Sequence, residues 1–535
     1  RAWVQQGDVM VAKVMLEELQ AQQALGQGVD LAADLVATTL GPAGRAVLIE
    51  RPFATPLLLR DGYAVLQQLE RDDPAEQMGV RAMRELAWRT LDQVGDGTSS
   101  AVIMARALLR EGRRVVQAGF AAAELQDAFD RQAGHAIAAL EARAITDPDQ
   151  AQLAQVAAQA AGGDLSLARR VVEAHLAAGA DGVVQVEEGR GSRDELDVAP
   201  GLHFDQGWIS AHFVEDQETQ SVEIANPLII FHLGALTELG PILPVLEMIA
   251  KADRGLVLVA DSVGGNALST LVVNRQRAGF KVAAVKAPGT GIWRQLMLED
   301  LAIATGGMVI GEQMGTTLEK LRPHMAGQAL RIRITRTGTT ITGGKGDPEM
   351  VRIRANEIRQ AIARERHLAY DREQHQRRLA RLEAGIATLR IGGITESEIA
   401  VRQRQAKAAS AAVQAARSGG VILGGSAAYL RAGRHCLENC ADDPLERLAA
   451  RIFAAALAAP LRQIAANAGG DGRMVAWQLA EPDAVGQCYD VGARGLRPEA
   501  VLVDALPVAR AVVQNAASTA ARLLGVAVAI TSRAA

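Results

Sequence analysis

A short acidic turn, GDGTSS at 95–100, stands directly before an apolar run with helical spacing that stops at Gly112. Its glycines let backbone N–H groups approach phosphate oxygens, and a helix start carries partial positive charge. Because an aspartate would repel phosphate unless a cation lay between them, Asp96 is interpreted as a Mg²⁺ ligand shared with phosphate oxygens. A helix cap in a tight turn explains the same motif equally well.

A second glycine-containing turn, TLGPAGR at 39–45, follows another helical segment, and Asp61 stands beside a glycine in RDGYAV at 60–65. Two glycine turns and two acids together fit a pocket for a nucleotide and a metal ion. The two commonest nucleotide signatures, GxxxxGK[ST] and a GxGxxG between a strand and a helix, are absent from the sequence. A standard P-loop or dinucleotide-binding fold is therefore not expected.

The elements around these turns are predicted to be mostly helical. From Val9 to about Arg143, apolar residues recur at three- and four-residue steps, with one short strand, RAVLIE. The middle of the chain differs, because short buried-strand patterns at 255–260, 281–288 and 306–312 alternate with helices. Such alternation predicts an α/β domain with parallel strands.

A charged stretch at 347–385 predicts two solvated helices that break near 367–370. The next helix is predicted to begin at a capping box formed by Thr395 and Glu398, and to end at Gly419-Gly420. Ala-rich helical patterns then return. This order predicts a multi-domain, mainly α protein in which both chain ends form one discontinuous domain with an α/β domain inserted between them.

Composition limits the function classes. The 535 residues suggest about three domains, and 57 basic and 61 acidic residues spread along the chain give no reason to expect nucleic acid or membrane as a partner. Cys436, Cys440 and Cys488 lack disulfide spacing and are expected to be buried, inert thiols in a cytoplasmic, reducing compartment. No apolar stretch is expected to reach the roughly 20 residues that span a bilayer, and no signal peptide is recognised at the N-terminus.

Longer blocks of the sequence resemble one known family. The chain is similar, in order, to the signature blocks of group I chaperonins, the GroEL type, in eight segments: TLGPAGRAVLIE, RDGYAV, GDGTSSAVIMARALLREG, DELDVAPGLHFDQGWIS, KVAAVKAPGTG, LEDLAIATGGMVIGE, YDREQHQRRLARLEAGIATLRIGGITESE and GGVILGGSAAYLRA. The match runs from about Val11 to Leu524, and blocks this long and numerous are highly specific. The chain is identified from them as a divergent member of that family.

The resemblance implies three domains in each subunit. An ATP-binding equatorial domain would comprise residues 1–142 and 419–535, an intermediate hinge domain 143–199 and 387–418, and an apical domain 200–386. Subunits of the family form seven-membered rings, stacked in two, which enclose unfolded polypeptide beneath a lid co-chaperonin. ATP contacts map onto Thr39, Leu40, Gly41, Pro42, Arg60, Asp96, Gly97, Thr98, Ser99, Ser100, Gly425 and, by a looser alignment, Asp490, with Asp96 as the Mg²⁺ ligand and Asp61 as one catalytic acid.

The resemblance also maps a polypeptide- and co-chaperonin-binding surface onto the middle domain. Spacing alone would place these apolar residues in the core, since Leu268 and Val272 are i,i+4 neighbours on a predicted helix. A binder of many unfolded chains needs non-directional hydrophobic contact, so the resemblance favours an exposed apolar groove instead. The residues concerned are Trp208, Phe213, Leu243, Leu246, Leu268, Val272 and Val273.

One position departs sharply from the family. In the helix that follows Thr395, the family's hydrolytic aspartate, which activates the attacking water, corresponds to Ala408. Glu398 lies about ten residues upstream, roughly 15 Å along a helix, and the next acid is Glu438, so neither substitutes easily. Because loss of such a base typically costs about 10²–10⁴ in rate while phosphate binding survives, slow hydrolysis is expected.

A weaker departure concerns charge pairs that differ between the states of a ring. Gln206 and Gln405 replace family arginines, although the partner acids Glu396 and Asp164 remain. Pairs that break between two states bias the equilibrium between them, so altered cooperativity is predicted.

Two interpretations of the function remain open. A divergent chaperonin would use ATP to change conformation and encapsulate clients, and the retained apolar residues of the middle domain favour it. A ring-forming scaffold paralogue, which binds ATP without a productive folding cycle, is favoured by Ala408 and the two glutamines. A metabolic enzyme comes third, since the nine histidines are scattered and form no Ser/His/Asp arrangement.

Overall fold

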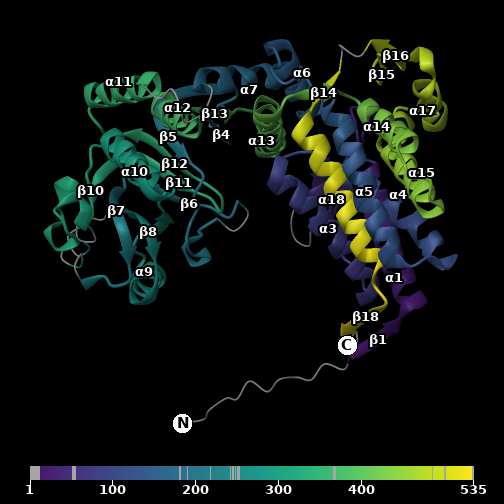
Figure 1. Ribbon diagram of the computed structural model, residues 1–535, viewed down its shortest axis with the longest axis horizontal. Coiled ribbons are helices and arrows are strands. Elements are labelled where there is room, and N and C mark those ends of the chain that lie inside the picture. Colours follow the sequence, from purple (N-terminus) through teal and green to yellow (C-terminus); the bar gives the residue numbers. More distant parts are fainter. Residues whose placement is uncertain are drawn as a thin grey trace, which may run out of the picture. The chain divides into compact units, whose positions relative to one another are not determined.

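The chain packs as two compact units, here called unit 1 and unit 2. The computed structural model describes residues 13–50, 56–179, 182–189, 191–216, 219–240, 243, 246, 249, 254–364, 369–484, 486–498 and 502–532. Unit 1 comprises residues 1–172 and 400–535, and unit 2 comprises residues 173–399 (Figure 1). The prediction that both chain ends pack together around an inserted middle segment is confirmed.

Unit 1 is mostly helical. Its N-terminal part contains β1 (Lys13–Glu17), α1 (Glu18–Ala37), β2 (Val47–Ile49), β3 (Leu57–Leu59), α2 (Gly62–Gln67), α3 (Pro74–Val94), α4 (Thr98–Gln117), α5 (Ala122–Glu141), α6 (Gln150–Ala160) and the first half of α7 (Leu165–Ala178). Its C-terminal part contains most of α13 (Glu396–Gly419), then β14 (Val421–Leu423), α14 (Ala427–Glu438), α15 (Pro444–Leu457), α16 (Ala459–Asn467), α17 (Gly472–Ala480), β15 (Gln487–Asp490), β16 (Gly495–Pro498), β17 (Val503–Ala505), α18 (Leu506–Leu524) and β18 (Val528–Ser532).

Small residues allow the helices of unit 1 to pack closely. A Cβ atom on Gly28 of α1 would lie 1.9 Å from the carbonyl oxygen of Glu76 on α3, so this crossing requires glycine. The buried faces are built largely from Ala, Val and Leu, and α18 lies against α3, α4 and α5 (Figure 1). An aromatic content of 3 % is therefore sufficient for this core.

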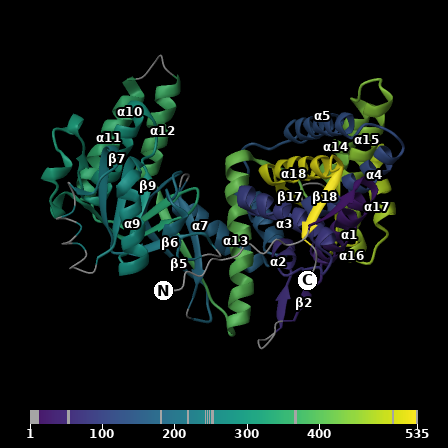
Figure 2. The ribbon, with the colours of Figure 1, turned by 90° about the horizontal axis from the view of Figure 1, so that it is seen from below.

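The two chain ends meet in unit 1. Strand β1 pairs antiparallel with β18. The side-chain amide of Gln22 donates to the carbonyl oxygens of Leu523 and Val526, at 2.9 and 2.8 Å. A separate hairpin of β2 and β3 stands off the helices (Figure 2). Side-chain bonds between residues so far apart in sequence hold the discontinuous unit closed.

Unit 2 is built around a mixed sheet. Its path runs β4 (Val183–Glu188), β13 (Gly385–Ile391), β5 (Glu195–Phe204), β12 (Thr339–Gly344), β11 (Gly327–Ile334), β7 (Leu228–Leu236), β8 (Leu256–Val263) and β9 (Val282–Lys286), with β10 (Val309–Ile310) on β7 and β6 (Val222–Ala225) on β11. The helices are α9 (Gly265–Ala278), α10 (Gly291–Thr305), α11 (Pro348–Arg364) and α12 (Ala369–Glu383). Strands β7, β8, β9 and β10 pair in parallel, which confirms the predicted parallel strands at β8, β9 and β10. Strand β7 was not predicted from the sequence.

The predicted helix boundaries are mostly confirmed. The charged stretch forms α11 and α12, and its predicted break falls partly on 365–368, outside the described residues. Helix α13 starts as predicted, because the backbone N–H of Glu398 donates to Thr395 Oγ1 and the Glu398 carboxylate accepts from the N–H of Ile394. It ends at Gly419, followed by Gly420 with φ of 85°.

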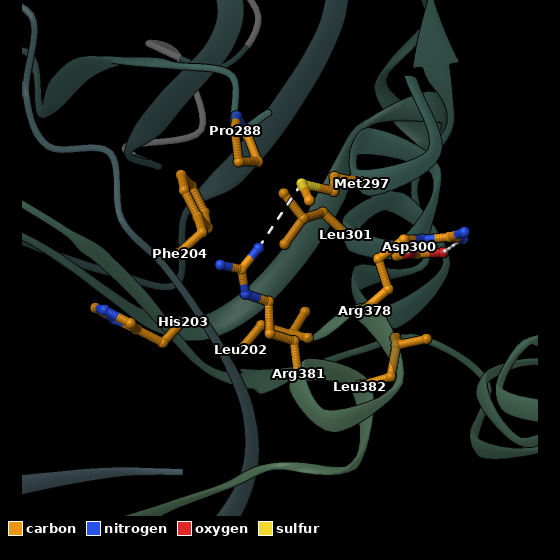
Figure 3. Close-up of a pocket in the computed structure, with 10 residues that line it drawn as sticks. All are labelled: Leu202, His203, Phe204, Pro288, Met297, Asp300, Leu301, Arg378, Arg381 and Leu382. Atoms are coloured by element: carbon orange, nitrogen blue, oxygen red, sulfur yellow. Dashed lines mark hydrogen bonds and ion pairs between the residues drawn. The ribbon is translucent and has the colours of Figure 1, made fainter. Parts of the chain in front are cut away.

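A buried charge cluster joins α10, α11 and α12. Arg378 and Asp300 are 3 % and 6 % exposed, and the Arg378 guanidinium donates to both Asp300 carboxylate oxygens, at 2.6 and 2.9 Å. Arg354 donates to Asp300 at 2.7 Å and to Glu299 at 2.8 Å. An adjacent cavity, crossed by Arg381, has a volume of about 20 Å³, which is room for one water molecule (Figure 3). The cavity is therefore too small to be a ligand site.

Asp300→Asn is expected to lower the free energy of unfolding of unit 2 by about 3 kcal/mol or more, since it leaves the buried guanidinium of Arg378 and the half-buried one of Arg354 with too little negative charge. Urea unfolding followed by circular dichroism measures the change. The matched control is Glu349→Gln, which breaks an exposed i,i+3 pair with Arg352 and should leave the transition unmoved. Equal effects of the two substitutions would contradict the prediction.

Two expectations about single segments need correction. Cys436 and Cys488 are buried, and burial raises the pKa of the Cys436 thiol to about 12, but Cys440 is half-exposed rather than buried. One helical stretch in the described part, 444–467, is long and apolar enough to cross a membrane by length and composition, contrary to expectation. It consists of α15 and α16, and 61 % of its most apolar window is buried inside the protein, as in core helices.

Candidate functional site

Three helix ends converge in unit 1 at the residues that the sequence singled out. A Cβ atom on Gly62, the first residue of α2, would lie 2.5 Å from Ser99 Oγ of α4 and 3.0 Å from Val36 Cγ1 of α1. The glycine at 62 therefore permits the start of α2, the start of α4 and the end of α1 to meet. This brings the RDGYAV and GDGTSS segments together, as predicted.

The GDGTSS turn leaves the start of α4 open. Gly95 ends α3 with φ of 72°, and Gly97 is the N-cap of α4 with φ of 85°. A Cβ atom on Gly97 would lie 2.6 Å from Val512 of α18, so both conformation and space require glycine. Within the described part of the chain no side chain caps α4, and its first backbone N–H groups stay available to an anion.

The helix-cap interpretation of Asp96 is wrong. Its carboxylate accepts only the N–H of Gly97, at 2.6 Å, among the bonds of the described residues, and does not reach the later N–H groups that a cap serves. Asp61 does cap a helix, accepting from the N–H of Ala64 at 2.9 Å, and also accepts from Thr98 Oγ1 at 3.4 Å. Asp61 is thereby fixed beside the first turn of α4.

A third acid, Asp504, was missed by the sequence analysis. Strand β17 pairs with β14, which places Asp504 opposite Ile422 and next to the turn that follows β14. The N–H groups of Gly425 and Ser426 donate to the Asp504 carboxylate. Both turn residues have left-handed backbones, with φ of 62° and 66°. The signal in the sequence was a charged residue inside the apolar run VLVDALPVA.

These carboxylates influence one another. Burial raises the pKa of Asp96, and the negative charge of Asp61 raises it further. Burial and the charge of Asp96 raise the pKa of Asp504 to about 7. Burial, Asp504 and Asp96 likewise raise the pKa of Tyr429, in the first turn of α14, well above its usual value. Such a cluster of acids favours a bound cation.

The donor set suits Mg²⁺ shared with phosphate. No group of three or more His, Cys, Asp or Glu residues in the described ranges is close enough to hold a metal ion alone. Mg²⁺ is usually held by one or two carboxylates, with phosphate oxygens and water completing the octahedron. Asp96 and Asp61 can supply the carboxylates, and the open N–H groups of α4 can bind the phosphates.

Asp504→Asn is expected to flatten the pH dependence of stability in the protein without nucleotide. The folded-state pKa of about 7 lies above the ordinary value of 3.8, so the stability linked to this group is present at low pH and is lost as pH rises from about 4 to about 7. Thermal melts at pH 5 and pH 8 should show a smaller fall in Tm for the variant than for wild type. Asp490→Asn is the control, and an unchanged difference in Asp504→Asn would contradict the prediction.

The remaining predicted contacts are only partly brought together. Thr39 is buried, while Gly41, Pro42 and Arg60 are exposed at the surface near the convergent helix ends. Asp490 instead lies at the end of β15, where its carboxylate accepts the N–H groups of Gly492 and Ala493, at 2.8 and 3.2 Å. Asp490 thus orders its own turn, and Asp504 is the C-terminal acid close enough to Asp96 for the two charges to interact.

Ala408 lies on the part of α13 that packs against the GDGTSS turn. A Cβ atom on Gly95 would lie 2.0 Å from Ala411 Cβ, so α13 touches this turn directly. Ala408 is half-buried and precedes Ala411 by one helical turn, on the same face of α13. The position predicted for a hydrolytic acid therefore faces the site without a carboxylate.

The predicted loss of charge pairing at Asp164 is offset by a neighbour of Gln405. Burial acts to raise the pKa of Asp164, but hydrogen bonds from Leu167 and Ser166 and the charge of Arg402 lower it overall. Arg402 lies three residues before Gln405 on α13 and so shares its face. The Gln405 replacement moves the positive charge by one turn rather than removing it.

The residues predicted to bind polypeptide differ in exposure. Leu243 and Val273 are 48 % and 45 % exposed. Trp208, Leu268 and Val272 are half-buried against the core of unit 2. The expected exposure is wrong for Phe213 and Leu246, which are 0 % and 8 % exposed and pack within that core. Their role in binding stays a prediction.

Comparisons with known proteins agree with this architecture. The model of the TCP-1/cpn60 chaperonin family matches residues 32–230 and 236–533, and the chain therefore belongs to that family. Its fold is similar to that of the chaperonin gp146 from the bacteriophage EL 2 (Pseudomonas aeruginosa), solved in the presence of ATP-BeFx. That match has a TM-score of 0.72 at 18 % identity and covers 97 % of this chain and 99 % of the other.

Membership of the chaperonin family supports a chaperone role in protein folding, with binding of substrate polypeptides and assembly into an oligomeric ring. The chaperonin fold predicted from the sequence is thereby confirmed. The finer division into five equatorial, intermediate and apical segments, with its four boundaries, stays a prediction.

Proposed function

We propose that this chain is an ATP-dependent chaperone that binds unfolded polypeptide and encapsulates it in a ring, with slow ATP hydrolysis. The proposal rests mainly on one observation: Asp61, Asp96 and Asp504 lie near two glycine-containing turns, at 95–97 and 424–426, and near the uncapped start of α4. The similar gp146 was crystallised in the presence of ATP-BeFx, which supports a nucleotide here. A cytoplasmic location, a lid co-chaperonin and one or two seven-membered rings belong to the same proposal.

In this proposal each group of residues has a separate role in binding the nucleotide. The N–H groups at the start of α4 would bind phosphate oxygens, and Asp96 and Asp61 would hold Mg²⁺, which would supply charge neutralisation. Asp504, fixed by Gly425 and Ser426, presents a hydrogen-bond acceptor to hydroxyl groups of the ligand. No carboxylate at 408 orients the attacking water, so hydrolysis is slow.

A ring-forming scaffold that binds ATP but lacks a productive folding cycle is the second candidate. Ala408 and the burial of Phe213 and Leu246 favour it, because both weaken a step of the cycle. Refolding of a chemically denatured enzyme, with and without ATP and a co-chaperonin from the same source, separates the two. ATP-dependent recovery of activity supports the chaperone, and ring assembly by native mass spectrometry without recovery supports the scaffold.

A further inference from the structure

The first glycine turn is held by a short helix from the other end of the chain. The side-chain amide of Asn467, the last residue of α16, donates to the carbonyl oxygens of Ala37 and Leu40, each at 2.8 Å. Its Oδ1 accepts from Gln463 Nε2 at 2.9 Å, which is consistent with the amide orientation. Asn467 therefore clamps the end of α1 to the turn that follows it.

The same helix also packs against the next residue of the turn. Gly41 has φ of 80°, and a Cβ atom there would lie 3.1 Å from Ile464 Cγ1. Ile464 stands one turn before Asn467 on α16. The Leu40–Gly41 peptide is thus held by a polar contact and an apolar contact from one side.

Holding this carbonyl fixes where the next N–H points. In a planar trans peptide, the C=O and the N–H that follows it point in opposite directions. Because the Leu40 oxygen is directed toward Asn467, the Gly41 N–H is directed away from α16. The Gly41 N–H forms no hydrogen bond with the described residues, whereas the N–H groups of Thr39 and Leu40 are bonded to Val36 and Ala37.

We infer that Asn467 is a positioning residue of the nucleotide pocket, which aims the free Gly41 N–H at a phosphate oxygen of the bound nucleotide. The inference rests on the proposed ATP binding. A hydrogen bond to a charged phosphate is about twice as strong as one between neutral groups, and a donor fixed beforehand needs no reorganisation on binding. The effect of Asn467 should therefore depend on the phosphates of the ligand.

The test compares ATP with adenosine, which has no phosphate, by isothermal titration calorimetry. Asn467→Leu should weaken ATP binding about tenfold or more, as expected for a lost bond to a charged group, and leave adenosine binding unchanged. Gln22→Leu is the matched control, because Gln22 also donates to two carbonyl oxygens across the chain but far along the sequence from this turn. It should lower Tm and leave both affinities unchanged.

Each other outcome overturns the inference. Equal losses for ATP and adenosine would show that Asn467 only supports the fold, and wild-type ATP affinity in the variant would show that it positions nothing. Asn467→Asp keeps the side-chain shape while removing the donors. The same titrations are made with this variant if the leucine variant does not fold. If the wild-type protein itself failed to bind ATP, the proposed function would be overturned as well. This outcome is distinct from a failure of the inference alone, in which wild type binds ATP.

Discussion

Replacing Ala408 with aspartate is expected to raise kcat for ATP hydrolysis by about 10²–10⁴ while leaving ATP affinity nearly unchanged, since a positioned general base acts on the chemical step. The new carboxylate would lie on the face of α13 that packs against Gly95 through Ala411. Ala408 is half-buried, so the new carboxylate would not be fully removed from solvent. Steady-state phosphate release and nucleotide titration measure the two quantities.

The control for this gain is Ala408→Asn, which has nearly the same shape and no basic carboxylate. It should keep the slow wild-type rate. A fast wild-type enzyme, or equal rates for the aspartate and asparagine variants, would show that position 408 does not limit hydrolysis.

Asp96→Asn is expected to weaken the Mg²⁺ dependence of ATP binding strongly, because Asp61 alone would remain as a carboxylate ligand. With Mg²⁺ present, affinity should fall by at least about 10–100-fold, the range seen even for indirect supports of a metal site. With Mg²⁺ removed by a chelator, the variant should bind ATP at least as well as wild type, because a carboxylate that repels phosphate has been neutralised. Fluorescent nucleotide titrations in both conditions give the comparison.

Asp92→Asn is the matched control, since Asp92 is an exposed acid one turn earlier at the end of α3. It should retain the full Mg²⁺ dependence. If Asp96→Asn also retained it, the metal would have to be held elsewhere, and the interpretation of the GDGTSS turn would fail.

Much of the fold could be predicted because local sequence patterns indicate the individual helices and strands. The predicted strands β8, β9 and β10 are aliphatic and buried, and the predicted pair Thr395 and Glu398 marks the start of α13. The glycine turns were informative for a physical reason, as Gly62 and Gly97 occupy places where a Cβ atom would collide with a neighbouring helix.

The rest depended on contacts between distant segments, which no local pattern reports. Asp504 comes near Asp96 because β17 pairs with β14. Asp490, which a loose alignment with the family had favoured, orders a surface turn instead. Spacing alone favoured the core for Phe213 and Leu246, where the structure places them, whereas the resemblance favoured the surface. The same apolar residue suits either place until tertiary packing is known. The effect of Arg402 on Asp164 was not predicted, because only position 405 was compared with the family. A positive charge on the adjacent turn of the same helix can take the place of the missing arginine.

The joining of both chain ends in unit 1 has a consequence for biosynthesis. A ribosome adds about 5–20 residues per second. Asp504 is therefore synthesised tens of seconds after the GDGTSS turn. Unit 2 is a continuous segment and is complete long before that point. Gly425, Asn467 and Asp504 all emerge late, and a partly synthesised subunit therefore lacks a finished site on which nucleotide could act.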